Sequence, residues 1–245
     1  MLSLTKGRYW ARLAQSPEDV DAAQRLRALV FTPQDQSDCD CDAFDESFEH
    51  VLVFEQCSNA LVCCYRFLPM ADGRELSRSY SAQYYDLSAL TSFAGKMVEM
   101  GRFCLRPGHS DPDILRVAWG AMTSYVDAQA VELLFGCTAF VGTDAEPYLD
   151  SFAILKERHL APKCWLPKEK APDIFRFSAA LGTKADAREA MQQMPPLLRT
   201  YLRMGAWVSD HAVFDWQLDT LHVFTGLEIA AIPPARKKLL RAVAK

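Results

Sequence analysis

The feature that most constrains the fold is a pair of helix-start signals in a chain otherwise rich in strand patterns. Ser16-Pro17 and Asp111-Pro112 each precede apolar residues that recur at helical spacing. In both, the polar residue suits the N-cap and the proline suits the first helical position. Apolar or alternating runs that are typical of strands lie before, between and after the two helices. This order predicts a mixed α/β fold.

The predicted elements follow one another as β-α-β-β-β-α-β-α, before a mixed C-terminal part. Strands are expected over 7–14, 50–55, 60–68, 96–105 and 132–141, and a third helix over 145–158. Residues 205–214 and 220–227 are further strand candidates. The acidic residues 31–48 carry few apolar side chains, so we expect a long loop there. Loops of that length are uncommon unless they are functional.

The composition is that of a folded soluble protein. With 245 residues, of which 50% are hydrophobic and 24% are charged, the chain can bury a substantial core. This composition excludes disorder, collagen-like repeats and coiled coil. No uncharged apolar run approaches the ~20 residues that span a bilayer, and the N-terminus lacks the apolar stretch of a secretion signal. We therefore expect a cytoplasmic protein.

The charge distribution argues against a nucleic-acid partner. The formal net charge is −4, whereas nucleic-acid binding usually leaves a basic excess. Neither a P-loop nor a G-x-G-x-x-G motif is present, which excludes the common nucleotide-binding sites. The C-terminal tail over 233–245 is nevertheless basic, through Arg236, Lys237, Lys238, Arg241 and Lys245. It is either a solvated helix end or a surface that touches anionic lipid or an acidic protein.

The eight cysteines do not have the spacing of a zinc site or of a disulfide framework, because no C-x-x-C pair occurs. Cys63, Cys104 and Cys137 lie in apolar strand-like segments, where free cysteine behaves as a small buried hydrophobe. This pattern fits a reducing compartment. The histidines are not grouped at ligand spacing either. We expect structural roles for His50, His159, His211 and His222.

Residues 97–107 combine an apolar strand pattern with Glu99 and Arg102. Burying charged side chains in a strand is costly unless they are paired. Residues three apart point to opposite faces of a regular strand, but a bulge at Gly101 would turn both toward one cleft. The two residues are therefore either a structural brace of the strand or part of an active site.

Short motifs in a fixed order span nearly the whole chain. These motifs are Arg25-Leu-Arg27-Ala-Leu-Val-Phe31, Asp42-Ala-Phe-Asp45, Tyr65-Arg66-Phe-Leu-Pro69, Ser79-Tyr-Ser-Ala82, Val98-Glu-Met-Gly-Arg102, Leu134-Phe-Gly-Cys137, Gly142-Thr-Asp144, His159-Leu-Ala-Pro162 and Gly205-Ala-Trp-Val-Ser-Asp-His-Ala212. Together they resemble the GCN5-related N-acyltransferase (GNAT) fold and, more specifically, the L-ornithine Nα-acyltransferases of bacterial ornithine-lipid synthesis. Each motif is weak alone, but the ordered combination is specific.

The related acyl-homoserine-lactone synthases match the charged positions Arg27, Asp42, Asp45, Arg66, Glu99 and Arg102. The motifs after residue 134 match the ornithine enzymes, so that branch is favoured. The resemblance implies a mixed central sheet splayed around an acyl-donor cleft, in one domain over 1–232. Core motifs would cover 8–158, with a family-specific C-terminal extension over 159–232.

The implied reaction is transfer of a fatty acyl group, often 3-hydroxylated, from acyl carrier protein to the α-amine of L-ornithine, giving lyso-ornithine lipid. The carrier's phosphopantetheine thioester would be the co-substrate, and the resemblance implies no metal and no bound cofactor. Because the product is amphiphilic, we expect the basic tail to touch the anionic inner membrane. Two alternatives remain: an acyltransferase for another amine, such as another amino acid or a homoserine-lactone-type acceptor, and a non-catalytic module that binds acylated carrier protein.

Acyl transfer from a thioester needs a deprotonated amine, a polarised carbonyl and a proton for the leaving thiol. Glu99 would be the base, directly or through a water, and backbone N–H groups freed by the bulge would polarise the carbonyl. Arg102 and Arg66 would bind the substrate carboxylate, for which guanidinium geometry is suited. Tyr148 lies where related acyltransferases place the proton donor to the thiolate, and its alternative role is packing.

The remaining acidic positions leave two interpretations open. Asp42 and Asp45 either hold the ornithine side-chain ammonium or pair with Arg27. The implied substrate-binding set is Arg102, Arg66, Arg27, Asp42 and Asp45.

A separate group of residues is expected to contact the phosphopantetheine arm of the donor. This group is Phe103, Leu105, Arg106, Gly108 and His109. Relatives that use coenzyme A carry Arg/Gln-x-x-Gly-x-Gly/Ala before the helix, whereas this chain carries Arg106-Pro-Gly108-His-Ser-Asp111. An acid at the helix start opposes a doubly charged pyrophosphate more than a single phosphodiester. The departure therefore favours acyl carrier protein as the donor.

Overall fold

The structure is a computed structural model that describes residues 2–31, 38–178 and 185–244. The chain forms two compact units, and each is discontinuous in sequence. Unit 1 consists of residues 1–69, 100–131 and 234–245, and unit 2 consists of residues 70–99 and 132–233. The single domain expected over 1–232 stays a prediction.

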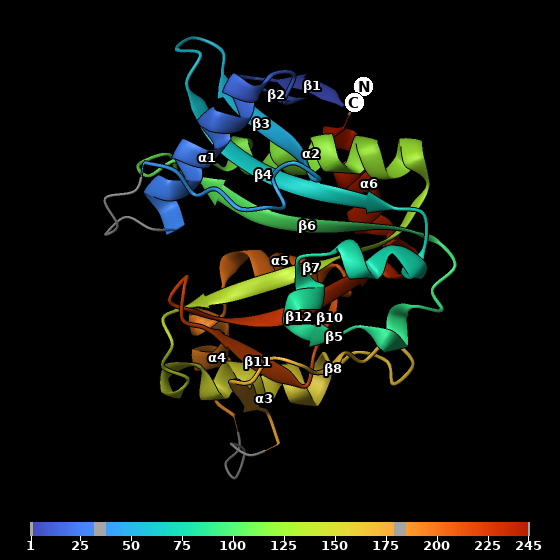
Figure 1. Cartoon of the computed structure of the whole chain (residues 1–245). Coiled ribbons are helices and arrows are strands. Elements are labelled where there is room, and N and C mark those ends of the chain that lie inside the picture. The colour runs from blue at the N-terminus through green and yellow to red at the C-terminus, as the bar shows by residue number, and fades with distance from the viewer. Residues whose placement is uncertain (1, 32–37, 179–184, 245) are drawn as a thin grey trace. The chain divides into compact units, whose positions relative to one another are not determined.

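Unit 1 is a sheet with helices on both faces (Figure 1). Its strands follow the order β1 (Ser3–Lys6), β2 (Tyr9–Leu13), β3 (Glu49–Glu55), β4 (Leu61–Met70) and β6 (Lys96–Leu105), of which residues 100–105 belong to this unit. The first four strands pair antiparallel. Its helices are α1 (Pro17–Phe31), α2 (Pro112–Gln129) and α6 (Pro234–Val243).

Alternation along β4 assigns the two faces of this sheet. Cys64 packs in the buried cluster beneath α1, together with Leu26 and Leu52. The next residue, Tyr65, points to the other face, where its hydroxyl donates to the carbonyl of Ala118 in α2 at 3.1 Å. Helix α6 packs beside α2, so the segment expected as a basic tail forms a helix of this unit.

Unit 2 contains a second antiparallel arrangement. Its order is β7 (Val131–Val141), β12 (Thr220–Glu228), β11 (His211–Asp215) and β9 (Ile174–Arg176), with β10 (Trp207–Val208) also paired to β12. Helices α3 (Leu149–Arg158), α4 (Ala187–Gln193) and α5 (Pro196–Arg203) complete one side of the unit. The remaining elements are β5 (Tyr85–Asp86), which pairs with β8 (Lys168–Glu169), and the short 3-10 helices η1 (Gly73–Arg78), η2 (Ser81–Gln83), η3 (Ser88–Leu90), η4 (Glu146–Tyr148) and η5 (Ile229–Ala231).

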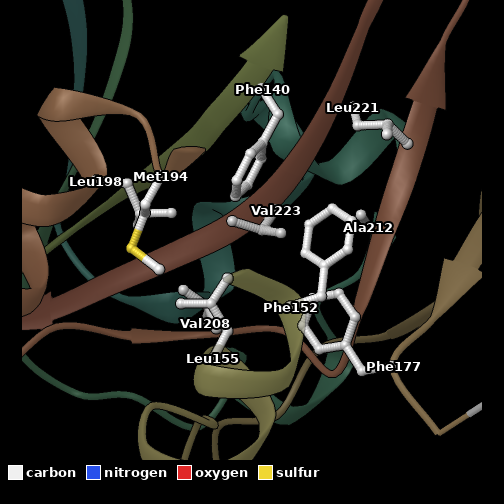
Figure 2. Close-up of a cluster of buried hydrophobic side chains, with 10 residues drawn as sticks. All are labelled: Phe140, Phe152, Leu155, Phe177, Met194, Leu198, Val208, Ala212, Leu221 and Val223. Carbon is white, nitrogen blue, oxygen red and sulfur yellow. The ribbon is translucent and has the colours of Figure 1, made fainter. Parts of the chain in front are cut away.

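The two faces of the unit 2 sheet have different neighbours. Figure 2 shows the core on the helix side, where Phe140 of β7 and Val223 of β12 meet Phe152 of α3. Cys137 and Phe224 are register partners in the same two strands and point the opposite way. On that opposite face, the ring of Tyr85 lies 5.6 Å from Phe224. The segment around η2 and β5 therefore covers the face of the unit 2 sheet opposite the helices.

Most predicted elements are confirmed, among them the strand over 7–14, which is β2, and three expectations need correction. Strand β1 was not expected, and Gly7, with a positive φ of 58°, turns the chain between β1 and β2. The candidate over 205–214 divides into β10 and β11. The helix expected from residue 145 begins with the 3-10 turn η4. Cys39 and Cys41 are joined by a disulfide, which the cysteine spacing did not lead us to expect.

Across residues 2–31, 38–178 and 185–244, no helix combines the length and the apolar character needed to cross a membrane.

Candidate active site

Three arginines and three aspartates of unit 1 form one ion-pair network. Its members are Arg27 of α1, Arg66 of β4, Arg102 of β6, and Asp40, Asp42 and Asp45 of the acidic loop. Three positive and three negative side chains leave the network with no formal net charge. This neutrality lets the sheet carry guanidinium groups that would be costly to bury alone.

The inner part of the network is buried and saturated. Asp45 accepts hydrogen bonds from Arg27 at 2.7 and 2.8 Å and from Arg66 at 2.5 Å. Burial alone would raise the pKa of Asp45, but the Arg27 guanidinium holds that pKa well below its usual range. Arg27 and Arg66 are 1% and 2% exposed. The pairing of Asp45 with Arg27, one of the two interpretations left open, is therefore present.

The outer part of the network is more open to solvent. Asp42 binds Arg66 through both oxygens at 2.6 Å and meets Arg102 at 3.4 Å. The Asp42 side chain keeps 23% of its surface exposed and that of Arg102 keeps 12%. Burial raises the pKa of Asp42, but the hydrogen bonds from Arg66 outweigh it and lower the pKa. An ionised carboxylate and a guanidinium are thus adjacent and only loosely bonded to each other.

Arg102 has an unusual backbone. Its φ is +51°, a left-handed conformation that residues with a side chain rarely adopt. We expected the irregularity of β6 at Gly101, and it falls one residue later. The Arg102 guanidinium donates to Asp40 at 3.1 Å and lies over the Phe31 ring, 5.9 Å from its centre. These contacts hold the arginine in a conformation that glycine would adopt more easily.

Glu99 lies on β6 in unit 2 and is only 1% exposed. Its carboxylate accepts hydrogen bonds from the backbone N–H of Tyr80 at 2.8 Å and of Ser81 at 2.7 Å. The Ser81 hydroxyl donates a third at 2.5 Å. The sequence marked residues 79–82 as a motif but gave them no role. In the structure, this motif supplies the three hydrogen-bond donors to the Glu99 carboxylate.

Tyr148 and Glu99 are not brought together. The hydroxyl of Tyr148 donates to the carbonyl of Val141 at 2.7 Å, and its ring packs 4.9 Å from Phe140 on the helix face of the unit 2 sheet. Ser81, which bonds to Glu99, contacts Cys137 on the opposite face. The sheet of unit 2 thus separates Tyr148 from Glu99, and the alternative packing role fits this tyrosine.

The expected donor contacts follow β6 into the start of α2, all within unit 1. Phe103 stacks on Tyr65 at 5.3 Å and on Trp119 at 6.2 Å, and Leu105 ends β6. Arg106 donates to the carbonyl of Leu61 at 2.7 Å. Several of these side chains therefore already brace the strand.

The turn before α2 remains exposed at its tip. Gly108 takes a positive φ of 82°, and the N–H of His109 donates to the carbonyl of Arg106. Asp111 is the N-cap of α2, as predicted, and accepts from the Asp113 N–H at 2.9 Å. It also accepts from the hydroxyl of Tyr9 at 3.0 Å. The chain's own carboxylate thus holds a place that favours an anion.

Two histidines that are distant in sequence meet in unit 2. His211 and His222 lie 5.2 and 5.7 Å from the ring of Tyr85, whose hydroxyl donates to the carbonyl of His222. Burial and packing fit the structural roles expected for both. Among the residues that the structure describes, no cluster of three or more His, Cys, Asp or Glu side chains could hold a metal ion.

Comparisons with known proteins agree on one family. Residues 27–120 match the model of the acetyltransferase (GNAT) domain. An L-ornithine N(alpha)-acyltransferase of Rhodobacter capsulatus is 30% identical over 238 residues, which cover 91% of each chain. One of Agrobacterium fabrum is 26% identical, covering 90% of this chain and 81% of that protein.

Solved structures agree on the fold. The N-acyl amino acid synthase FeeM, from uncultured soil microbes, superposes with a TM-score of 0.52 at 11% identity, over 91% of this chain and 92% of that chain. TofI in an apo form gives a TM-score of 0.50 at 15% identity, over 97% of this chain and 99% of that chain. The identity and coverage of the sequence relatives, together with this fold, show that the chain is an acyltransferase with the GNAT fold and belongs to the L-ornithine Nα-acyltransferase family.

Proposed function

We propose that the protein transfers a fatty acyl group from acyl carrier protein to the α-amine of L-ornithine, forming lyso-ornithine lipid. The observation that carries this proposal is the similarity to relatives named L-ornithine N(alpha)-acyltransferase along about nine-tenths of the chain. In the reaction an amide C–N bond forms and the thioester C–S bond breaks. The amine gives up a proton, and the thiolate leaving group takes one.

The outer pair of the Arg–Asp network supports an amino-acid acceptor. Arg102 offers a planar guanidinium to the ornithine carboxylate, and Asp42 offers an ionised carboxylate to the side-chain ammonium. The weak 3.4 Å contact between them can be exchanged for these two substrate contacts. Arg27, Arg66 and Asp45 would act behind them by holding Asp42 and Arg102 in place. An acceptor with one carboxylate and one distal ammonium matches this pair in charge.

Glu99 is the proposed base for the α-amine. The three hydrogen bonds that it accepts hold its carboxylate in one orientation. A buried, fixed carboxylate of this kind can take the amine proton directly or through a water.

The N-terminus of α2 supports a carrier-protein donor over coenzyme A. Asp111 already places a negative charge where a pyrophosphate would bind. The remaining contacts to the phosphopantetheine arm would come from Phe103, Leu105, Gly108 and His109, with Arg106 beside the phosphodiester.

We also propose that α6 touches an anionic membrane surface on the cytoplasmic side. Arg236 and Lys238 are exposed on this helix, and Leu239, which directly follows Lys238, is 62% exposed. Basic residues next to an exposed apolar side chain suit the interface of an anionic bilayer. An enzyme that releases an amphiphilic product gains from this location.

The test of the reaction is an assay of the full-length protein with 3-hydroxyacyl carrier protein and a panel of single amino acids. Mass spectrometry of the products is expected to find acyl-ornithine as the main product, with a preference over lysine of roughly tenfold or more. Acyl-coenzyme A serves as the alternative donor and is expected to be poor. Acylation of a different amine, or no amide with either donor, would overturn the proposal.

Asp42→Asn tests the acceptor contact in the same assay. Norvaline has the ornithine skeleton without the side-chain ammonium, so the wild-type protein is expected to prefer ornithine. In the variant, the ratio of kcat/KM for ornithine to kcat/KM for norvaline is expected to fall by roughly tenfold, because a charge-assisted hydrogen bond is removed. Most of this change is expected in the KM for ornithine. Asp113→Asn, which alters an exposed ion pair with Arg116, is the matched control. Equal preference for ornithine in Asp42→Asn and wild type would refute the assignment.

A further inference from the structure

The segment that binds Glu99 is itself firmly anchored in unit 2. The hydroxyl of Ser79 accepts from the N–H of Ala82 at 3.0 Å and closes the turn. The carbonyl of Ala82 accepts from Lys170 at 2.5 Å. Two residues after η2, the Tyr85 hydroxyl donates to the carbonyl of His222 on β12 at 2.8 Å. The donors to Glu99 therefore belong to a fixed element and not to a free loop.

The three donors differ in what they can do when Glu99 changes its protonation state. The N–H groups of Tyr80 and Ser81 can only donate, so they favour the ionised carboxylate. The Ser81 hydroxyl can donate to the carboxylate or accept from the protonated acid, because its hydrogen rotates. Its oxygen also lies 3.4 Å from the sulfur of Cys137, which can accept that hydrogen weakly. Ser81 is the donor among the three that can serve both states.

Because both side chains are buried, the ability of the Ser81 hydroxyl to donate or to accept affects the energy of both protonation states of Glu99. Ser81 is 0% exposed and Glu99 is 1% exposed, so water does not replace the hydroxyl at no cost. Without the hydroxyl, the ionised form of Glu99 loses a short charge-assisted hydrogen bond. The protonated form loses the acceptor that its new hydrogen would need.

We infer that Ser81 is the positioning residue of this acyltransferase, holding Glu99 in one rotamer and accommodating the proton that Glu99 takes from the amine. This inference rests on the proposed role of Glu99 as the base. Ser81 acts through Glu99 and is not itself assigned to the reacting atoms.

The titratable groups around this segment come from several elements. Tyr80 and Tyr84 flank Ser81, Tyr85 follows on β5, Cys137 faces it from β7, His222 lies on β12 and Lys170 follows β8. Lys96 and Arg102 belong to the same strand as Glu99. Of these groups, Cys137 contacts the Ser81 hydroxyl directly, and a thiol loses its proton above neutral pH. A difference between wild type and variant in the acid limb of the pH profile therefore reports on Glu99.

The first test measures kcat against pH for wild type, Ser81→Ala and Ser81→Thr with the carrier-protein donor. Ser81→Ala is expected to lower kcat by roughly tenfold and to move the acid limb upward by about one pH unit. The shift is upward because the charge-assisted hydrogen bond that the ionised Glu99 loses is stronger than the neutral hydrogen bond that the protonated form loses. Ser81→Thr, which retains the hydroxyl, is expected to keep the limb near wild type. Ser151→Ala removes another fully buried hydroxyl of unit 2, which donates to Ala190, and is expected to leave the limb unmoved.

A limb that stays in place in a folded Ser81→Ala variant would overturn the inference. If Ser81→Ala does not fold, Ser81→Cys decides the matter, because a thiol of similar size is only a weak donor. Its acid limb must then move upward, and an unmoved limb also overturns the inference.

A second readout needs no acyl donor and separates this inference from the proposed function. A double-mutant cycle compares the unfolding equilibria of wild type, Ser81→Ala, Glu99→Gln and the double variant at neutral pH. The two changes are expected to be coupled by roughly tenfold in the unfolding constant. Additive effects would refute the contact itself. An inactive wild type with a coupled cycle would instead refute the proposed reaction and leave the positioning contact standing.

Discussion

At the scale of single residues, Asp45 is the carboxylate that two buried guanidinium groups share. Arg27 and Arg66 both donate to it, and Gln24 adds a bond at 2.9 Å. Removing one partner of a buried ion pair leaves an uncompensated charge, which is far more costly than losing an exposed pair. The inner network therefore supports the outer pair only while Asp45 is ionised.

Asp45→Asn is expected to lower the free energy of unfolding by about 3–5 kcal/mol at pH 7 and to flatten its pH dependence. Because the folded-state pKa of Asp45 is far below that of the unfolded chain, its contribution is complete above about pH 4. That contribution is lost as the pH falls through the acid range. Urea unfolding from pH 3 to 7 measures both effects. Asp113→Asn is the exposed control, and a variant with the wild-type slope below pH 5 would contradict this account.

At the scale of elements, β12 and β10 approach closely because one position has no side chain. A Cβ built on Gly226 would lie 2.4 Å from ring atoms of Trp207, whose indole stacks on Phe224. The ring is 6% exposed and lies between strands, so it has little room to move.

Gly226→Ala is therefore expected to destabilise the protein by about 1–3 kcal/mol through overpacking. The matched control is Gly101→Ala on β6, where a built Cβ meets no atom within 4 Å. Thermal or urea unfolding of both variants measures the difference. Equal unfolding midpoints for the two variants would contradict the prediction, because they would mean that the Trp207 ring moves aside without loss of stability.

The sequence predicted those elements that depend on local signals. Asp111 caps α2 because an acceptor before proline is a short-range pattern, and strand β6 follows from its own apolar run. The segment that donates hydrogen bonds to Glu99 was not predicted to do so. Its elements η2 and β5 are only three and two residues long, so they show no periodicity in the sequence. Arg27 and Arg66 share Asp45 because the folded chain brings α1, β4 and the acidic loop together, and local sequence patterns do not predict that contact.

Arg102 illustrates the same limit. Sequence reasoning correctly expected an irregularity near Gly101, since glycine tolerates unusual backbone angles. The positive φ falls on Arg102 instead. In this conformation its guanidinium donates a hydrogen bond to Asp40 and lies over the Phe31 ring, and these contacts stabilise the unusual backbone. Both partners come from distant parts of the chain, so local propensity could not identify the residue that carries the strain.

At the scale of the whole molecule, a formal charge of −4 coexists with a basic helix. Helix α6 is fixed to α2 by its C-terminal half: Arg241 pairs with Asp127 at 2.8 Å, and the Ser124 hydroxyl donates to the carbonyl of Ala244. The side chain of Val243 lies against the position of Gly120. Deleting residues 236–245 would therefore disturb packing as well as charge, which makes deletion an ambiguous test of membrane contact.

Neutralising only the exposed charges avoids that ambiguity. Arg236→Gln with Lys238→Gln is expected to leave unfolding unchanged and to weaken binding to anionic vesicles by about fivefold for each removed charge. Sedimentation with phosphatidylglycerol-containing vesicles measures the effect, and pure phosphatidylcholine vesicles are the control. Added salt should reduce wild-type binding toward that of the variant, because exposed charges are screened over about 10 Å at 0.1 M. If wild type and variant sediment equally with anionic vesicles, α6 does not contact the membrane through these charges, and its basic residues serve only to keep the helix solvated.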